Sequence, residues 1–486
     1  MPRPYLTHPR ATAGLRSTAA LVALTLAACT VGPDYKRPQM ELPSAWSVSA
    51  GDAGVSMRWW TLYADAQLNL LVEEGLAHNN DLRLAAARVD EARAGLTIVR
   101  SDGLPNVTAG GTAARNRISE RSGSFFPGIP TEFNDITVTL NASWEIDFWG
   151  RYRRANEAAR GDLLASTAAR DAVQLSLISD VVRGYFALRA LDSQVDITRR
   201  TIQTRRESLR LQRMRYAAGE ASQYDLRQVE AEASAAEALL PVLEQQQSQQ
   251  ENALAVLLGR SPRAVMEDAI GRGLALDALV RPPAVPAGLP SDLLQRRPDI
   301  REAEQRLVSA NARIGVARAA YYPSISLTGM FGFESEKLTN LFSGPARIWQ
   351  FGASAAQTVF DAGRTGAQVD AAQARHEQQL VGYQSTVQNA FREVKDALVA
   401  SRKSEERSGA ESSRVKALRD AYRLAQLSYS SGESSLLEVL DAERGLLGAE
   451  LDQVQAQRNQ LTATADLFKA LGGGWDNGAK QATVAQ

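Results

Sequence analysis

The sequence predicts a mainly α-helical fold with a transmembrane β part, built from a duplicated unit of long helical hairpins plus one β-hairpin. Three observations support this prediction. The chain repeats itself at long range, it contains long stretches that are nearly free of proline, and four short segments alternate strictly between apolar and polar residues. Long helices require stretches that are nearly free of proline, and half-exposed strands produce the alternation of apolar and polar residues.

The duplication covers most of the chain. Asp81 aligns with Asp299 at an offset of 218 (299 − 81), and Gly150 aligns with Gly363 at an offset of 213 (363 − 150). One insertion of about five residues in the first copy accounts for the difference, and insertions of this kind lie in exposed loops. A unit of about 215 residues is far longer than a solenoid repeat, so we interpret it as an internal duplication.

Composition narrows the function classes. The chain has 55 acidic and 55 basic residues, so it presents no overall field that would attract nucleic acid, and we expect no nucleic-acid partner. Hydrophobic residues make up 44% of the chain but aromatic residues only 6%. This balance favours closely packed helices rich in alanine and leucine.

The N-terminus carries a targeting signal. Three arginines precede an apolar run from Ala19 to Ala28, which is too short to span a bilayer and is typical of a secretory signal. The run ends in Leu26-Ala27-Ala28-Cys29, which resembles the bacterial lipoprotein cleavage box. The resemblance implies a lipoprotein signal peptide over residues 1–28 and palmitate on Cys29. A chance cysteine at the end of an ordinary signal is the alternative.

Cys29 is also the only cysteine, which excludes internal disulfides and a cysteine-based metal cluster. Thr30 follows it instead of an aspartate, and by resemblance to lipoprotein sorting this favours the outer membrane.

Proline is distributed very unevenly. Pro241 is the only proline between Gly150 and Gly259, and none follows Pro345. The stretch from residue 152 to about residue 217 would form a helix on the order of 100 Å long at about 1.5 Å per residue. Residues 81–103 and 221–258 predict two shorter helices.

An apolar stripe in the second copy indicates how its long helix packs. The stripe recurs in steps of three, four and four, and its members are Val369, Ala372, His376, Leu380, Tyr383, Val387, Phe391, Val394 and Leu398. An eleven-residue period gives nearly straight or slightly right-handed packing. An ordinary amphipathic bundle helix explains the stripe equally well.

Four segments predict strands. From Ile136 to Ile146 the even positions are apolar and the odd positions are polar. Residues 106–113, 324–333 and 349–355 alternate in the same way, so each copy is expected to hold one β-hairpin, at 105–147 and 323–360.

These strands have the length and the alternation that a membrane-spanning barrel requires. The strands of a soluble β-sandwich alternate in a similar way, so the pattern is compatible with a membrane barrel and with a soluble sandwich. Four strands cannot close a barrel, whereas three chains would supply twelve.

Several motifs together resemble a known family. They are Cys29-Thr30-Val31-Gly32-Pro33-Asp34-Tyr35, Trp60 with Asp65 and Leu68, Asn80-Asp81-Leu82, Leu293-Leu294-Gln295-Arg296-Arg297-Pro298-Asp299-Ile300-Arg301, and Leu471-Gly472-Gly473-Gly474-Trp475. On these residues the chain resembles the TolC-like outer-membrane efflux lipoproteins of the NodT type. The resemblance implies a homotrimer with a 12-stranded β-barrel in the outer membrane, continued by a 12-helix periplasmic tube.

The resemblance also implies a function and partners. The chain would be the outer-membrane channel of a tripartite efflux system, exporting small molecules by passive conduction through a gated duct. A periplasmic adaptor (membrane fusion) protein and an inner-membrane pump would be its partners, with outer-membrane lipid around the barrel. We expect a lipid-anchored, membrane-spanning protein with a long periplasmic part.

The expected division of the chain follows the duplication. It comprises the signal (1–28), an N-terminal equatorial or anchor segment (29–78), the first repeat (79–259), a proline-rich equatorial linker (260–298), the second repeat (299–472) and a C-terminal tail (473–486).

Two turns at the far ends of the helical hairpins are candidate contact sites. Each contains a glycine that permits a left-handed turn, with serine nearby to cap the next helix. Plain turn chemistry explains them too. The resemblance assigns them to adaptor contact, through Tyr216, Gly219, Glu220, Tyr429, Gly432 and Glu433.

A candidate periplasmic gate follows the second turn. Leu437, Asp441 and Arg444 recur at spacings of four and three, along one face of a helix. The resemblance implies an apolar ring at Leu437 and an acidic ring at Asp441, with Arg444 as ion-pair partner. The first copy has Tyr224, Gln228 and Ala231 at the matching positions, so the second copy alone would form the gate. An ordinary helix surface is the alternative.

An enzyme is not expected: His8 lies in the signal, His78 and His376 have no neighbouring metal ligands at helical spacing, and no glycine-rich phosphate-binding loop follows a strand. The sequence therefore predicts no cofactor. The rival function is a periplasmic adaptor or scaffolding lipoprotein with a long helical hairpin. That class should have one helical hairpin, whereas this chain has two.

Overall fold

The computed structural model describes residues 30–43, 58–121, 126, 128, 130–281 and 292–474. The predicted signal peptide, Cys29, Trp475 and most of the C-terminal tail lie outside these residues. Within them, no helix combines the length and the apolar character needed to cross a bilayer.

The two copies contain matching elements in the same order. η1 (Trp59–Tyr63) and α2 (Ala66–His78) precede the first copy, which has α3 (Asn80–Asp102), β1 (Asn106–Arg117), β2 (Glu132–Ile146), α4 (Arg151–Ala217) and α5 (Gln223–Leu257). After α6 (Pro262–Glu267), η2 (Leu276–Ala278) and α7 (Leu293–Arg296) come α8 (Pro298–Ala319), β3 (Ser324–Ser335), η4 (Leu338–Asn340), η5 (Gly344–Ala346), β4 (Arg347–Ala356), α9 (Arg364–Ser430) and α10 (Leu436–Ala470).

The chain forms two compact units, and each takes residues from both copies. Unit 1 comprises residues 1–39, 89–166 and 303–383, and it contains all four strands. Unit 2 comprises residues 40–88, 167–302 and 384–486, and it contains both helical turns. The duplicated halves are therefore intertwined.

The prediction of long helices and short strands is confirmed. The helix expected from about 152 to 217 is α4, with 67 residues, and its counterpart α9 has the same length. α5 continues through Pro241, so this proline does not end the helix. Every member of the apolar stripe on α9 is buried or half-buried, including the half-buried His376.

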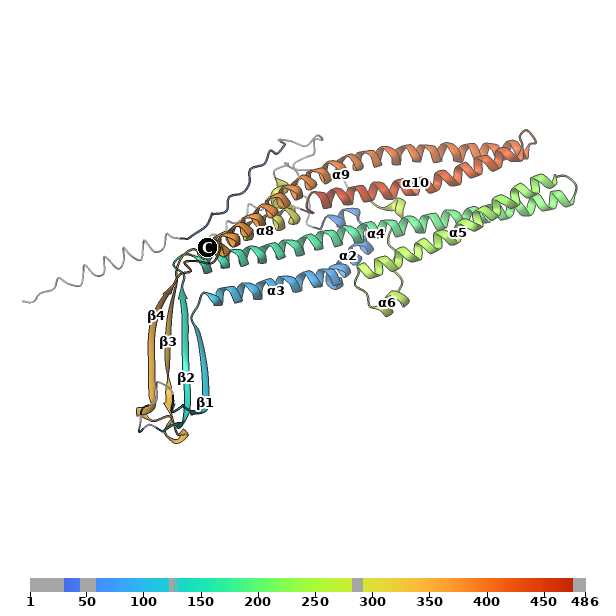
Figure 1. The fold of residues 1–486 in the computed structure, drawn as a ribbon. Helices are drawn as coiled ribbons and strands as arrows, with labels where there is room; N and C mark the ends of the chain where they lie inside the picture. The colour runs from blue at the N-terminus through green and yellow to red at the C-terminus, as the bar shows by residue number, and fades with distance from the viewer. Residues whose placement is uncertain are drawn as a thin grey trace, which may run out of the picture. The chain divides into compact units, whose positions relative to one another are not determined.

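The strands of unit 1 form one antiparallel sheet in the order β1-β2-β3-β4 (Figure 1). Ala142 of β2 pairs with Val107 of β1 on one side and with Gly329 of β3 on the other, and Gly329 in turn pairs with Phe351 of β4. The register thus places most of the apolar residues of the four strands on one face.

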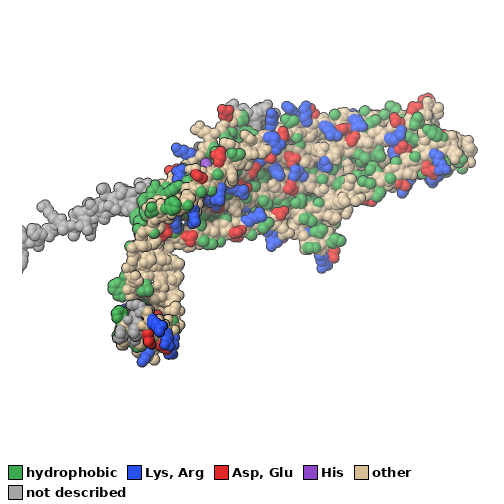
Figure 2. Space-filling view, viewed as in Figure 1, with side chains coloured by type: hydrophobic (Ala, Val, Ile, Leu, Met, Phe, Trp, Pro, Cys, Tyr) green, Lys and Arg blue, Asp and Glu red, His purple; other side chains and the backbone are tan. Residues whose placement is uncertain are grey.

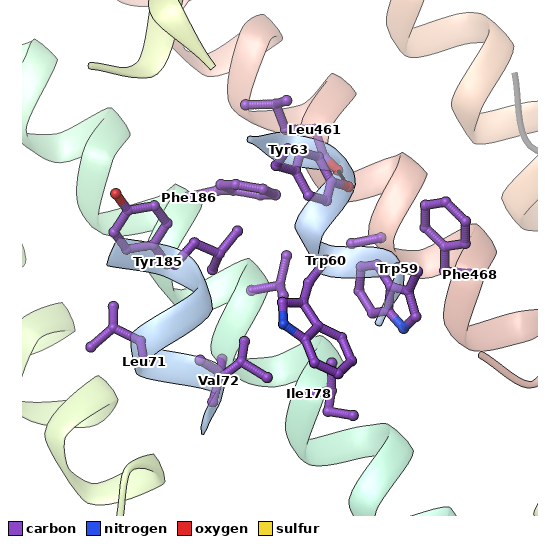
Figure 3. Close-up of a cluster of buried hydrophobic side chains, with 14 of the residues drawn as sticks. Trp59, Trp60, Tyr63, Leu71, Val72, Ile178, Tyr185, Phe186, Leu461 and Phe468 are labelled. Carbon is purple, nitrogen blue, oxygen red and sulfur yellow. Dashed lines mark hydrogen bonds between the residues drawn. The ribbon is translucent and has the colours of Figure 1, made fainter. Parts of the chain in front are cut away.

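Unit 2 is centred on an aromatic cluster (Figure 3). Trp59 stacks on Phe468 of α10 with ring centroids 4.9 Å apart, and Tyr63 meets Phe186 of α4 edge to face at 4.8 Å. Ile270, Leu276, Leu279 and Leu293 from the linker region belong to the same cluster. The N-terminal and linker segments therefore cover the middle of the long helices.

The duplication is also visible in two matching joints. The Asn79 amide donates to the Leu257 carbonyl at the end of α5, at 2.9 Å. The equivalent residue, Arg297, donates to the Ala470 carbonyl at the end of α10, also at 2.9 Å. Each joint thus satisfies a helix-terminal carbonyl that has no partner within its helix.

Arg297 explains why the Arg-Arg-Pro-Asp motif is needed. Its buried guanidinium also binds Asp299 at 2.6 Å and Glu393 of α9 at 2.7 Å. Burial opposes its charge, but the hydrogen bonds to both carboxylates outweigh this and raise the pKa of Arg297. One side chain thereby ties the start of α8 to α9 and α10.

Residues 30–39 lie along unit 1 as an extended segment. Arg37 binds Glu304 of α8 through two bonds, of 2.6 and 2.8 Å, and Asp34 binds the buried Arg154 of α4 at 2.6 Å. The Val31 amide donates to the Trp149 carbonyl at 3.0 Å. This segment is fixed to the region where β2 ends and α4 begins.

Candidate functional site

The sheet has one apolar and one polar face. The apolar face combines Val107, Ala109, Ile136, Val138, Leu140, Trp144, Leu327, Phe331, Phe333, Trp349 and Phe351. Several of these side chains are far from buried: Val107 is 64% exposed, Trp349 66% and Phe351 76%. A contiguous exposed apolar surface of this kind marks contact with a membrane or another protein.

The opposite face is mainly polar, although Phe133, Met330 and Ile348 also lie on it. Across the sheet, Thr108 pairs with Asn141, which pairs with Met330, which pairs with Gln350. Nearer the loops the hydroxyls of Thr112 and Thr137 form a hydrogen bond of 2.7 Å. The face suits contact with water, as the lumen of a barrel requires.

The two edges of the sheet are open. Within the described residues, β1 pairs only with β2, and β4 pairs only with β3. Each outer edge therefore presents backbone N–H and C=O groups without a ladder partner. In hydrocarbon each such group costs several kcal/mol, so this sheet cannot lie in lipid as a single chain.

The helical turns assigned to adaptor contact have matching geometry. Gly219 has φ +79° and Gly432 has φ +80°, in the left-handed region that favours glycine. The Glu220 amide donates to the Arg215 carbonyl at 2.8 Å, and the Glu433 amide donates to the Ser428 carbonyl at 2.8 Å. Both turns therefore close the preceding helix in the same way.

Serine caps follow both turns. The Ser222 hydroxyl accepts from the Asp225 amide at 3.0 Å, and the Asp225 carboxylate accepts from the Ser222 amide, which forms a capping box. At the second turn the Ser435 amide and hydroxyl both donate to Glu438, at 3.3 and 3.2 Å.

The six turn residues differ in their availability. Tyr216, Gly219, Glu220, Gly432 and Glu433 are exposed. Tyr429 is half-buried, because its hydroxyl accepts from Arg215 at 3.0 Å and the same guanidinium lies 5.5 Å from its ring centroid. Arg215 thus connects the two hairpin ends, a role that no local sequence spacing indicates.

The structure brings together two of the three candidate gate residues. Arg444 Nη2 lies 3.3 Å from Asp441 Oδ1, one helical turn away on α10. Leu437 precedes them and is 54% exposed. Arg444 also reaches Glu232 of α5 at 3.4 Å, so the gate candidate is linked to the first hairpin within one chain.

A buried ion cluster lies beside these residues. The buried Arg205 of α4 binds Glu443 of α10 at 3.1 Å and the carboxylate and carbonyl of Glu232 at 3.3 and 2.6 Å. Burial raises the pKa of Glu443, which Arg205 partly offsets, and burial also raises the pKa of the neighbouring Tyr422 to about 12. The sequence alone did not indicate this cluster, because Glu443 lies more than 200 positions after both Arg205 and Glu232.

The described residues hold no group of three or more histidine, cysteine, aspartate or glutamate side chains placed to bind a metal ion.

The comparisons with known proteins agree with this arrangement. The outer membrane efflux protein family matches residues 71–260 and 289–473. The "Probable efflux pump outer membrane protein TtgC" of Pseudomonas putida is 36% identical over 466 residues, covering 94% of this chain and 95% of the relative. The "Outer membrane protein OprJ" of Pseudomonas aeruginosa is 35% identical and covers 95% and 96%.

Solved structures show the same fold. The CmeC outer membrane channel of Campylobacter jejuni superposes with a TM-score of 0.88 at 27% identity, covering 93% of this chain and 96% of that one. The open-state MtrE outer membrane channel of Neisseria gonorrhoeae gives a TM-score of 0.82 at 35% identity, covering 92% and 98%.

Fold, apolar sheet face and relatives together define a channel protein of the bacterial outer membrane that serves efflux. The chain belongs to the outer membrane efflux protein family. Its relatives are transport proteins and not enzymes, and they do not favour the rival class of periplasmic adaptor lipoproteins.

The turn glycines lead to a first prediction. We expect Gly432→Ala to destabilise the second turn by about 1–2 kcal/mol, because a Cβ is unfavourable in the left-handed conformation. An added Cβ there meets no other atom within 4 Å, so the strain is purely backbone strain. Thermal unfolding of the purified protein in detergent, followed by circular dichroism, would measure it.

The matched control is Gly409→Ala, in the interior of α9, where an added Cβ also has open space. This change should leave the melting temperature equal or raised, because alanine favours a helix over glycine by about 1 kcal/mol. Equal effects of the two substitutions would argue against a strained turn.

Proposed function

We propose that three copies of this chain assemble into a gated duct, with a 12-stranded barrel in the outer membrane and a 12-helix tube in the periplasm. The open edges of the sheet carry this proposal. An apolar face of bilayer height combined with unpaired edges requires additional strands, and further copies of the same chain can supply them. Eight strands form the smallest known barrels, so four are too few.

Strand direction suits this closure. β1 and β4 lie at opposite edges of the sheet and run in opposite directions, because each neighbouring pair is antiparallel. β4 of one copy can therefore pair with β1 of the next in the same antiparallel pattern. Apolar residues would then continue around the outside, and Thr, Asn, Ser and Gln would line the lumen.

The helical turns support the proposed partners. In the proposed tube both turns lie at the periplasmic mouth, where Tyr216, Glu220 and Glu433 present exposed side chains. We assign Tyr216, Gly219, Glu220, Tyr429, Gly432 and Glu433 to contact with a periplasmic adaptor protein, through which an inner-membrane pump delivers small molecules. The Arg215–Tyr429 contact would hold both turns in a fixed relation for this docking.

The gate is assigned to Leu437, Asp441 and Arg444. Three copies of Asp441 near a threefold axis would narrow the duct and favour cations there. The ion pair of Arg444 with Glu232 supports a closed position, because it attaches α10 to the neighbouring hairpin, and Asp441 contacts the same guanidinium.

A lipid anchor on Cys29 is consistent with the docking of the residues that follow it. A Cβ added to Gly150 would lie 2.8 Å from Thr30 Cγ2, so Thr30 is packed at the junction of β2 and α4. In the proposed barrel this junction faces the periplasmic leaflet, where an acyl chain could enter the membrane.

The test of the duct is its conductance. Purified protein should run as a heat-modifiable trimer, and it should conduct ions when added to a planar lipid bilayer. A monomer that remains folded in water and does not conduct would contradict the proposal.

The gate leads to a separate prediction. Asp441→Ala should raise the conductance of the resting channel several-fold and weaken its preference for cations, because three carboxylates leave the constriction. Single-channel recording would measure both effects. Glu267→Ala, which removes an exposed carboxylate from α6, serves as the control and should conduct like the wild type. Wild-type conductance for Asp441→Ala would remove Asp441 from the gate.

The anchor is tested by metabolic labelling. Radiolabelled palmitate should enter the wild-type protein but not Cys29→Ser, because no other cysteine is present. Label retained by the serine variant would show that Cys29 is not the acylated residue.

A further inference from the structure

At the loop end of the sheet, basic and acidic residues are distributed differently between the two faces. On β1, Arg115 and Arg117 lie on the same face as Val107, Ala109 and Ala113, since alternate residues share a face. On β4, Arg347 lies on the face of Trp349 and Phe351. The apolar face therefore ends, beside the loops, in three arginines.

Acidic residues show the opposite distribution. Asp135 of β2 and Glu334 of β3 occupy the polar face near the same end. Among the described residues of the four strands, Glu132 is the single carboxylate on the apolar face there, and it is paired in register with Arg117. The apolar face thus ends with three positive charges and one negative charge. This local excess of positive charge contrasts with the net charge of zero of the whole chain.

One chain leaves these arginines incompletely paired. Glu132 accepts from Arg115 at 3.0 Å and from Arg117 at 3.4 Å, and both arginine side chains are more than 70% exposed. Arg347 is exposed and has no ion-pair partner among the described residues. Figure 2 shows basic side chains gathered at the loop end of the sheet.

Within one copy these arginines lie at opposite edges. β1 and β4 are separated by three strand spacings, or roughly 14 Å at about 4.8 Å each. In the closed barrel proposed above, on which this inference rests, β4 of one copy lies beside β1 of the next. Arg347 would then stand next to Arg115 and Arg117 of the neighbouring copy at each of the three seams.

We propose that each seam binds a phosphate group of a lipid in the outer leaflet, through Arg115 and Arg117 of one copy and Arg347 of its neighbour. Guanidinium groups bind phosphate oxygens with paired, charge-assisted hydrogen bonds. Their position fits a lipid head group, because they follow directly after the apolar face that contacts the acyl chains. The site is incomplete in a single chain.

The position of the three arginines along the strands also favours a lipid site over a solvated loop. A lipid-facing arginine costs about 2–4 kcal/mol at the bilayer midplane but only about 0–1 kcal/mol near the interface. Trp349, two residues after Arg347 on the same face and paired with Phe331, is a side chain typical of the interface. The three arginines thus lie where a charge is tolerated and where phosphate is available.

The test counts bound lipids on the purified trimer by native mass spectrometry. The probe is lipid A, whose glucosamine head group carries phosphate, and phosphatidylcholine is the zwitterionic comparison. The wild type should retain lipid A in preference, up to one molecule for each seam. The combined variant Arg115→Gln, Arg117→Gln, Arg347→Gln should bind it about tenfold more weakly, because charge-assisted hydrogen bonds are lost.

The matched control removes three positive charges elsewhere. Lys395, Arg402 and Lys416 are exposed on α9 in unit 2, and their combined change to glutamine should leave lipid A binding unchanged. Arg347→Gln alone should weaken binding in part, since the site needs both copies. All variants should remain conducting trimers, because the substitutions change only lipid binding. If the wild type itself is not a trimer, the proposed duct is rejected, and that result is distinct from a failure of the lipid site.

Four results would overturn the inference. The triple variant could bind lipid A as well as the wild type does. The α9 control could lose binding equally, which would indicate general charge attraction. Inorganic phosphate could displace lipid A, which would indicate a site for free anions. Arg347→Gln could have no effect while the β1 changes abolish binding, which would place the site within one copy.

Discussion

The hydrogen-bonding requirement of the peptide backbone in lipid is the constraint on which the rest of this structure depends. The sheet has an apolar face exposed along β2, β3 and β4, and two edges without partners. Hydrocarbon solvates apolar side chains well and backbone amides poorly, so the face favours lipid and the edges oppose it. Only additional strands resolve this conflict, and the antiparallel order lets identical copies provide them.

The duplication gives the two halves matching structural joints but different functional residues. Asn79 and Arg297 hold the ends of α5 and α10 through the same carbonyl contact, yet only Arg297 adds two carboxylate partners. The helices α4 and α9 have equal length, which a continuous tube wall would require. The copies can diverge where symmetry does not constrain them, as at Leu437, Asp441 and Arg444, whose counterparts in the first copy are Tyr224, Gln228 and Ala231.

Much of the fold could be predicted from the sequence because its signals are local and long. The alternation from Ile136 to Ile146, the proline-free run of α4 and the stripe on α9 each extend over many residues, so periodicity determines them well. The helix predicted over 221–258 is likewise present as α5, which continues through Pro241.

The candidate site was predictable only in part. The spacing of Asp441 and Arg444 places both on one helix face, and the structure pairs them. Glu232 and Arg205 could not be found in this way, since their contacts with α10 depend on how two hairpins pack together. Long-range ion pairs leave no periodic signal in a single sequence.

The buried cluster bears on how the proposed gate could move. Arg205 contacts Glu443 of α10 and Glu232 of α5 from a buried position, so moving α10 away from α4 and α5 would take Glu443 away from this buried cation. Breaking such a pair on one side costs about 3–5 kcal/mol. The pair between Arg444 and the exposed Asp441, by contrast, is weak, as exposed ion pairs are. Opening should therefore begin at Arg444 and Asp441, with the helices pivoting about the cluster around Arg205.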